Sequence, residues 1–315
     1  MSDRVRVVYV AGAGRSGTTL LAMLLGALPG VMTLGETRHL WARGVRDDEL
    51  CSCGAHFHAC PFWTEVGERA YGGWDTRRAE RMLELQRQVD RFRTVPRMLA
   101  RGRPAAPAAA VDEYMAAFLH LYQAAREVSG GILVDSSKAP SYLGLLQRRR
   151  DVDVRVVHLV RDSRAVVHSW ARLRFRPDSG SGGAEHMALI GPRRSTADWL
   201  ANNLAIDLLN ARDRTASLIR YEELVTEPAA AIQRMLGPWL AQPAALAALA
   251  AGGPIDIGTQ HVVAGNPMRF QTEELRLKPD YEWRAAMPRS RRLAVGAATW
   301  PLLLRYGYRP GAGRA

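Results

Sequence analysis

The chain contains 315 residues, 47% of them hydrophobic, so it can bury a full core, and we expect one α/β domain over residues 1–315, with insertions. Its formal net charge of +12 favours an anionic partner, such as a nucleotide, an acidic substrate, nucleic acid or membrane headgroups. Because no uncharged apolar run reaches about 18 residues and MSDRVR carries no signal-peptide pattern, we expect no transmembrane helix and a cytoplasmic location.

The first predicted element, Val5–Val10, is a β-branched apolar run that is typical of a buried parallel strand. A turn with Gly12, Gly14 and Gly17 follows, and leucines then recur at helical spacing. Glycines let the backbone N–H groups of such a turn converge on an anion at the helix N-terminus, where the peptide dipoles favour negative charge. The segment therefore predicts a phosphate-binding loop.

The glycine spacing of this turn matches the Walker A pattern G-x-x-x-x-G-K-[ST]. Thr18 and Thr19, however, stand where that pattern has Lys and then Ser or Thr. The Walker lysine serves the β- and γ-phosphates of a nucleoside triphosphate, so its absence argues for a ligand without that chain. Arg15 instead offers a planar guanidinium to a terminal oxyanion.

Further along the chain, three more apolar runs predict strands: Ile132–Val134, Val154–Val160 and Ala216–Ile219. Helical patterns separate most of the predicted strands. This alternation is typical of a parallel sheet with crossover helices, in which ligands gather at the carboxyl ends of the strands. A Cys/His-rich loop and a charged helical stretch at 76–100 predict an insertion at about 45–110. The loop composition of residues 174–196 predicts either a mobile lid over a site or a disordered solvent loop.

Polar residues follow the second and third predicted strands. The VDSSK segment puts a carboxylate, two hydroxyls and Lys138 on a turn, which suits either a ligand crevice or a helix cap. Arg161 ends the next strand, and Ser169 follows about two helical turns later, so the two can share one phosphate if the strand end faces that helix. We interpret Arg164 and Arg172 as parts of a solvated helical face.

The segments GAGRSGTTLL, LGETR, VDSSK and HLVRDSRAVVHSW resemble, in the same order, the motifs of sulfotransferases that use 3′-phosphoadenosine 5′-phosphosulfate (PAPS). RYEELV and GNPMRF look like later segments of bacterial members, and the resemblance spans about residues 5–285. It implies a P-loop NTPase-like α/β fold, a parallel sheet flanked by helices. It also implies PAPS as the donor, which carries a single 5′-phosphosulfate, and no required metal.

The resemblance also assigns donor-binding residues. Arg161 and Ser169 would hold the 3′-phosphate, while Tyr221 and Arg269, which lie in the two later segments, are expected to contact the donor. The loop that would hold the 5′-phosphosulfate consists of Gly14, Arg15, Ser16, Gly17, Thr18 and Thr19.

The tyrosylprotein branch of the family points to Glu36 as the general base. There a Gly-Glu-Glu-Thr-Arg segment supplies the base, and residues 35–38 look like it with one glutamate fewer. Other branches use a histidine, which makes His39 the competitor. In an in-line transfer, Glu36 would take the proton of the acceptor hydroxyl. Arg15, the loop amides and Lys138 would stabilise the charge that grows on the leaving phosphate.

The expected acceptor is a hydroxyl of a small molecule, a saccharide or a glycolipid, and a glycolipid would bring peripheral membrane contact. Two other classes stay open: a P-loop nucleotide kinase or NTPase, which the missing Walker lysine disfavours, and an inactive nucleotide-binding protein, against which the catalytic set argues. Nucleic-acid binding is not expected, because the arginine clusters at 146–150 and 289–292 come without stacking aromatics or a helix-turn-helix signal. The sequence does not fix an oligomeric state.

The segment CSCGAHFHACPFW carries Cys51, Cys53 and Cys60 together with two histidines. Three interpretations are open for it: a packed loop with reduced thiols, a zinc site with an atypical Cys-x-Cys spacing, and a disulfide. We expect no catalytic metal. Nearby aromatic residues are interpreted as packing rather than as an acceptor pocket: Phe57, Phe62, Trp63, Tyr71 and Trp74.

The C-terminal third supplies the remaining candidates. We expect Asn266, Arg269 and Lys278 to close over the nucleotide. Lys278 is one of two lysines among 43 basic residues, the other being Lys138, and this bias toward arginine makes each retained lysine informative. The apolar stretch 294–304 predicts a buried helix that Pro301 interrupts.

Overall fold

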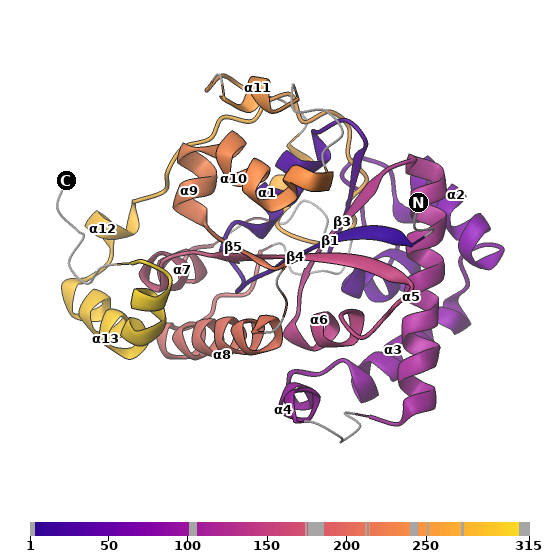
Figure 1. Cartoon of the computed structure of the whole chain (residues 1–315), viewed down its shortest axis with the longest axis horizontal. Coiled ribbons are helices and arrows are strands. Elements are labelled where there is room, and N and C mark those ends of the chain that lie inside the picture. Colours follow the sequence, from indigo (N-terminus) through magenta and orange to yellow (C-terminus); the bar gives the residue numbers. More distant parts are fainter. Residues whose placement is uncertain are drawn as a thin grey trace.

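The computed structural model describes residues 4–100, 106–173, 175, 186–211, 213, 215–239, 245–250, 252–271 and 274–308. Within them, five parallel strands form one sheet in the order β2-β3-β1-β4-β5 (Figure 1). The strands are β1 Val5–Ala11, β2 Val31–Gly35, β3 Ile132–Lys138, β4 Val152–Val160 and β5 Ser217–Arg220. The predicted α/β class with a parallel sheet is confirmed.

The central strand β1 shows why its sequence is continuously apolar. Val7 lies opposite Leu133 of β3 and Val154 of β4, so β1 is paired on both edges. Val7 packs in the buried cluster on one face of the sheet, and the next residue, Val8, packs in the cluster on the other face. A strand covered on both faces needs apolar side chains at successive positions, as parallel sheets generally do.

The edge strand β2 is the strand that the sequence does not predict. Its residues VMTLG are few and mix Thr and Met with aliphatic residues, so they give no long β-branched run. The strand forms because Val31 pairs with Ile132 of β3 and packs with the leucines of the first helix. It ends at Gly35, where a Cβ atom would lie 2.3 Å from Cγ1 of Val262. Tertiary contacts therefore decide this element.

Helices cover both faces of the sheet (Figure 1). One buried cluster joins the sheet to α1, α9, α10 and α11, and the other joins it to α2, α3, α5, α6 and α8. Helices α7, α12 and α13 lie beside each other beyond the β5 side. Their bounds are α1 Thr18–Gly26, α2 Pro61–Tyr71, α3 Thr76–Val89, α4 Val95–Leu99, α5 Ala108–Ser129, α6 Pro140–Leu146, α7 Ser163–Trp170, α8 Pro192–Asn210, α9 Tyr221–Thr226, α10 Pro228–Leu236, α11 Ala245–Ala250, α12 Trp283–Ala286 and α13 Arg289–Arg305.

The predicted insertion at 45–110 packs onto the sheet through a shared core. Phe57 and Trp63 belong to the same buried cluster as Val7 of β1. The charged stretch expected as one helix is two helices, α3 and α4. Directly after the end of α3, the buried carboxylate of Asp90 accepts a hydrogen bond from Nε of Arg38 at 2.6 Å. Residues 101–105 of the expected joint lie outside the described residues.

Two other loop and helix predictions need correction. Of the expected lid at 174–196, residues 174 and 176–185 lie outside the described residues, and its last five residues are already the first turn of α8, whose N-terminal proline fits a helix start. The helix α13 is longer than expected and runs through Pro301. It buries one face, with Val295 and Leu303, whereas Trp300 is 51% exposed.

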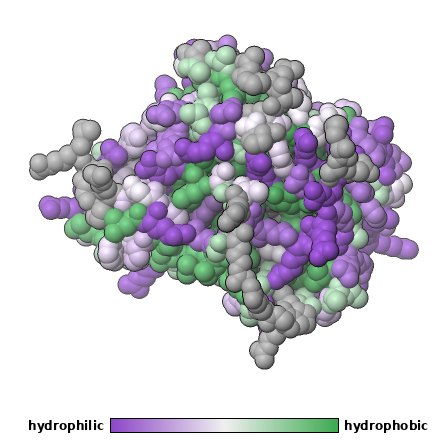
Figure 2. Space-filling model, viewed as in Figure 1, coloured by the Kyte–Doolittle hydropathy of each residue, from purple (hydrophilic) through white to green (hydrophobic). Residues whose placement is uncertain are grey.

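Among the described residues, none of the helices combines the length and the hydrophobicity that crossing a bilayer requires. On the face drawn in Figure 2, hydrophobic side chains lie in small groups between hydrophilic ones.

Candidate active site

A cleft of about 660 Å³ lies at the carboxyl ends of the strands, where a parallel sheet places its ligands. Apart from Ser16, Arg269 and Lys278, the predicted site residues line it. They include Gly14, Arg15, Gly17, Thr18, Thr19, Glu36, Lys138, Arg161, Ser169 and Tyr221. Residues that are far apart in the sequence therefore meet in one cavity.

The loop between β1 and α1 is shaped by two tight contacts. Gly17, the residue before α1, has φ 95°, and a Cβ atom there would lie 2.6 Å from Cδ2 of Tyr221. A Cβ atom on Gly14 would lie 2.7 Å from the ring of Trp170. Arg15 also has a positive φ, 68°, and its guanidinium lies 4.7 Å from the centre of the Trp170 ring. The loop is thus held against both walls of the cleft, with the N-terminus of α1 behind it.

Ser16 and Arg269 are buried beside the cleft rather than lining it. The hydroxyl of Ser16 has no hydrogen-bond partner within the part of the chain that the structure describes. Nη1 of Arg269 donates to the carbonyl oxygen of Gly265 at 3.1 Å, and its guanidinium lies over the ring of Phe270. Arg269 therefore supports Gly265, which does line the cleft.

Arg161 and Ser169 both line the cleft. Arg161 follows β4 directly, and α7 turns so that Ser169 faces the same cleft. The guanidinium of Arg161 lies 4.3 Å from the centre of the Tyr221 ring, and Nη2 lies 2.9 Å from Oδ2 of Asp280. The cleft thus presents a cation and a hydroxyl together with residues of the loop that precedes α1.

Asp280 is a cleft residue that the sequence does not single out, because its partner Arg161 lies 119 residues away. Burial raises the pKa of Asp280, but the hydrogen bond and charge of Arg161 lower it more, and the net pKa is below its ordinary value. The carboxylate is therefore ionised at neutral pH and pairs with the cation. An anionic ligand at Arg161 competes with it.

The interpretation of Arg164 as a solvated residue is wrong. Its side chain is buried, with Nη2 2.6 Å from Oδ2 of Asp162 and the guanidinium 4.8 Å from the centre of the Trp283 ring. Trp283 comes from α12, far along the chain, so no local pattern reveals this burial. Arg172 is exposed as expected and pairs with Glu282.

Glu36 and Lys138 form an ion pair on the other side of the cleft. Glu36 follows β2 and Lys138 ends β3, with Nζ against Oε1. The two side chains are 11% and 21% exposed. Burial raises the pKa of Glu36, but the charge of Lys138 and its hydrogen bond help to bring the net pKa below its ordinary value of 4.5. Glu36 is therefore a carboxylate at neutral pH.

A buried hydrogen-bond network fixes the turn that carries this pair. Asp135 of β3 accepts hydrogen bonds from the hydroxyls of Thr37 and Tyr122 and, at 2.8 Å, from the backbone N–H of Ser137. The hydroxyl of Ser137 in turn accepts from the backbone N–H of Arg38 at 3.0 Å. Two strand ends are thus joined beneath the cleft.

His39 is placed to compete for the role of base. Its Nε2 lies 3.7 Å from Oε2 of Glu36, and its side chain is 40% exposed. Burial lowers the pKa of His39 below its ordinary value of 6.5, because the attraction of Glu36 does not offset burial and the nearby cations. The imidazole is therefore neutral at neutral pH.

Beyond Glu36, the wall of the cleft comes from His39, the helical turn Leu40–Arg46 and the residues after it. Of these, the sequence identifies His39 alone. The wall is mostly charged, and Arg43 pairs with Glu49. Its lining side chains are His39, Ala42, Arg43, Arg46, Asp47 and Glu49. None of the aromatic residues of the insertion, considered as an acceptor pocket, is among the described lining residues, and Phe57, Phe62 and Trp63 are core.

The C-terminal candidates are placed differently from one another. Asn266 lines the cleft, and its side chain accepts a hydrogen bond from the backbone N–H of Met268 at 3.1 Å. Lys278 is exposed and is not among the described lining residues.

A model of the sulfotransferase family matches residues 8–237, so the chain belongs to the sulfotransferase family. The sulfotransferase domain of the Synechococcus PCC 7002 olefin synthase has a similar structure, with a TM-score of 0.50, 16% identity and coverage of 98% of this chain and 97% of that domain. The sulfotransferase domain from the curacin biosynthetic pathway gives a TM-score of 0.48, 14% identity and coverage of 97% and 98%. A sulfotransferase from Mycobacterium avium gives a TM-score of 0.45 and 13% identity, and the match covers 97% of this chain and 78% of that one. No curated protein matches the sequence.

Proposed function

We propose that this sulfotransferase takes its sulfuryl group from PAPS and transfers it to an acceptor hydroxyl. The observation that supports the proposal is that candidate donor-binding residues and a candidate catalytic ion pair line one cleft. Gly14, Arg15 and Gly17 of the loop line it with Arg161 and Ser169. The ion pair of Glu36 with Lys138 faces the same space.

The donor end suits a nucleotide with two separate anionic groups. The amides at the N-terminus of α1 and the guanidinium of Arg15 would take the 5′-phosphosulfate. Arg161 and Ser169 would take the 3′-phosphate, which displaces Asp280 from the guanidinium. Thr18, not a lysine, directly follows Gly17, so the loop lacks the side chain that a triphosphate requires.

The transfer itself exchanges two bonds to sulfur. The acceptor oxygen forms a new bond to sulfur while the bond from sulfur to the 5′-phosphate oxygen breaks, and adenosine 3′,5′-bisphosphate leaves. The proton of the acceptor hydroxyl passes to the carboxylate of Glu36, which is ionised and ready to accept it. Arg15, the loop amides and Lys138 stabilise the negative charge that develops on the leaving phosphate.

The acceptor wall favours a polar molecule. Charged and imidazole side chains line it beyond Glu36, and the aromatic residues of the insertion are elsewhere. Such a wall offers hydrogen bonds to a hydroxylated small molecule, a saccharide or the headgroup of a glycolipid.

Calorimetric titration with adenosine 3′,5′-bisphosphate tests the donor assignment. We expect binding by the wild-type protein and a loss of about tenfold to a hundredfold in affinity for Arg161→Ala, because a charge-assisted hydrogen bond is removed. Arg172→Ala is the matched control, since Arg172 is exposed and pairs with Glu282. Labelled PAPS with a panel of sugars and phenols, with and without Mg²⁺, then tests transfer. ATP turnover in the absence of bisphosphate binding would overturn the proposal in favour of a nucleotide kinase or NTPase.

A further inference from the structure

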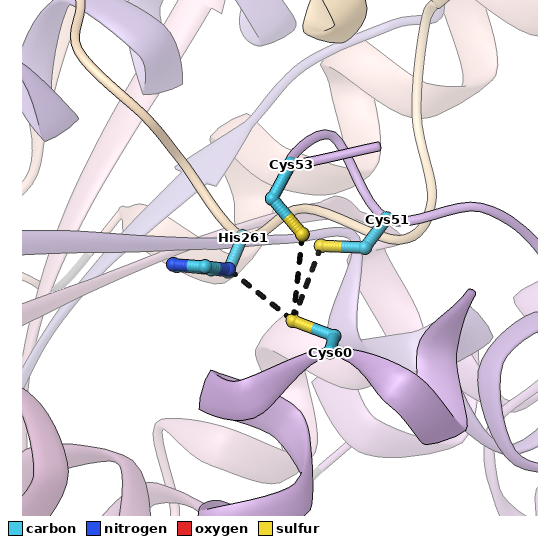
Figure 3. A group of neighbouring side chains, drawn as sticks. All are labelled: Cys51, Cys53, Cys60 and His261. Atoms are coloured by element: carbon cyan, nitrogen blue, oxygen red, sulfur yellow. Dashed lines mark hydrogen bonds between the residues drawn. The ribbon is translucent and has the colours of Figure 1, made fainter. Parts of the chain in front are cut away.

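Four side chains of the metal-binding type converge outside the cleft (Figure 3). Their ligand atoms, the sulfurs of Cys51, Cys53 and Cys60 and a ring nitrogen of His261, all lie within 4.8 Å of one another. Sγ of Cys60 is 3.7 Å from each of the other sulfurs and 3.2 Å from Nδ1 of His261. The sequence shows the three cysteines but not their partner, which lies 201 residues beyond Cys60.

The sulfur distances separate a disulfide from the other two interpretations that the sequence leaves open, the zinc site and the packed loop with reduced thiols. A disulfide requires a sulfur–sulfur distance of about 2.05 Å, whereas the three cysteines are free here. In a tetrahedral site with Zn–S distances of about 2.3 Å, two ligand sulfurs lie about 3.8 Å apart. The observed spacing of 3.7 Å fits that geometry.

We propose that Cys51, Cys53, Cys60 and His261 bind one Zn²⁺ ion in a closed structural site. Three thiolates and one imidazole form a ligand set that zinc takes in structural sites. Because all four positions come from the protein, no coordination position is open for water or substrate. The site is therefore structural and stands apart from the sulfuryl transfer.

The local backbone explains how a Cys-x-Cys spacing works. The N–H of Gly54 donates to the carbonyl oxygen of Cys51 at 2.9 Å, and the N–H of Cys51 donates to that of Ala55 at 2.8 Å. Gly54 has φ 90°, which glycine adopts without strain. This tight turn brings the sulfurs of Cys51 and Cys53 to the same side, toward Cys60 (Figure 3). Cys60 directly precedes α2, whose N-terminal dipole favours a thiolate.

The fourth ligand is held in place by the residue between the first two cysteines. The hydroxyl of Ser52 donates to the carbonyl oxygen of Gln260 and accepts from the N–H of Val262 at 2.8 Å. The N–H of Ser52 donates to the carbonyl oxygen of Val262 at 2.9 Å. These hydrogen bonds fix the backbone on both sides of His261. The ring of His261 also stacks on Phe62, with centroids 5.2 Å apart. Such supporting contacts orient a metal-binding imidazole.

The location of the cluster gives the ion a role. It joins the cysteine loop to the segment 260–266, which continues into the cleft. In that segment the carbonyl oxygen of Ala264 accepts from the N–H of Glu36 at 3.4 Å, and Gly265 and Asn266 line the cavity. The metal therefore anchors the C-terminal wall of the cleft to the insertion.

Metal analysis of the full-length protein, purified without a metal-affinity column or chelator, tests the site. We expect about one zinc per chain by elemental mass spectrometry and, after exchange for Co²⁺, the intense thiolate charge-transfer and tetrahedral d–d bands of a sulfur-rich site. Cys60→Ser and His261→Ala should lose most of the metal. His56→Ala is the control, because His56 is an exposed histidine of the same loop that contacts the backbone of Asp48 instead.

Two results would overturn the site. One is wild-type protein that holds no zinc after supplementation and gives no cobalt bands while its thiols react freely in the folded state. The other is a disulfide in the intact protein, seen as a loss of two hydrogens in the mass spectrum. These readouts use the wild type, so they stand even if a variant misfolds. They are also separate from donor binding, which the bisphosphate titration measures.

Discussion

The two sides of the cleft are built from different materials. The donor side uses backbone amides, glycines pressed against aromatic rings and arginines, which stay charged at every accessible pH. The catalytic side uses Glu36, Lys138 and His39, whose charges depend on one another and on burial. The donor side therefore depends on shape, whereas the catalytic side depends on protonation. Substitutions and pH should separate the two.

The largest effect is expected from Glu36→Gln. Loss of a general base lowers kcat by about 10² to 10⁴-fold, while the affinity for adenosine 3′,5′-bisphosphate should stay near that of the wild type. Initial rates with saturating donor and a calorimetric titration measure the two quantities. His39→Gln is the comparison, since it lies 3.7 Å from the same carboxylate. A normal rate for Glu36→Gln together with a severe loss for His39→Gln would move the role of base to the histidine.

A smaller loss, on the donor side, is expected from Gly17→Ala. The substitution places a Cβ atom 2.6 Å from the Tyr221 ring at φ 95°, so the loop must shift, and we expect bisphosphate affinity to fall more than about tenfold. Gly30→Ala is the control because Gly30 also has a positive φ, 74°, but nothing lies within 4 Å of its Cβ position. Both variants should lose about 1–2 kcal/mol of stability in thermal melts from the left-handed backbone. Equal bisphosphate binding by both would contradict a shape-dependent donor side.

The smallest effect is the pH dependence near neutrality. Because the pKa of Glu36 is lowered, the carboxylate stays ionised down to pH values below 4.5, and kcat should have no acidic limb between neutrality and that value. Stability follows the same sign: the contribution of the ion pair is present above the unfolded pKa and is lost as pH falls through the folded one. A limb between pH 6.5 and 4.5 would instead identify His39, whose pKa is lowered from its ordinary value of 6.5.

The motifs at strand ends could be predicted from the sequence because their chemistry is local. Each of these motifs can be recognised from a few neighbouring residues: the loop before α1, Lys138 at the end of a buried strand, and Arg161 after the next strand. Parallel strands then bring these separate ends to one edge of the sheet, which is why a local reading finds most of the cleft.

The features that the sequence missed are completed by distant segments. Asp280 and His261 acquire their roles only through partners 119 and 201 residues away. Arg164 is buried by the ring of Trp283, and β2 is a strand because β3 and α1 surround it. Local periodicity carries no information about such pairings, so these roles become visible only in the folded chain.

The scarcity of lysine has a practical consequence. Lys138 lies in the cleft against Glu36, whereas Lys278 is exposed. Reagents that acylate amines therefore have two lysine targets besides the N-terminal amine. Labelling of Lys138 depends on what occupies the cleft, whereas labelling of Lys278 depends on the dose of reagent. Arginine side chains do not react with such reagents, so labelling of Lys138 can be normalised to labelling of Lys278 within the same sample.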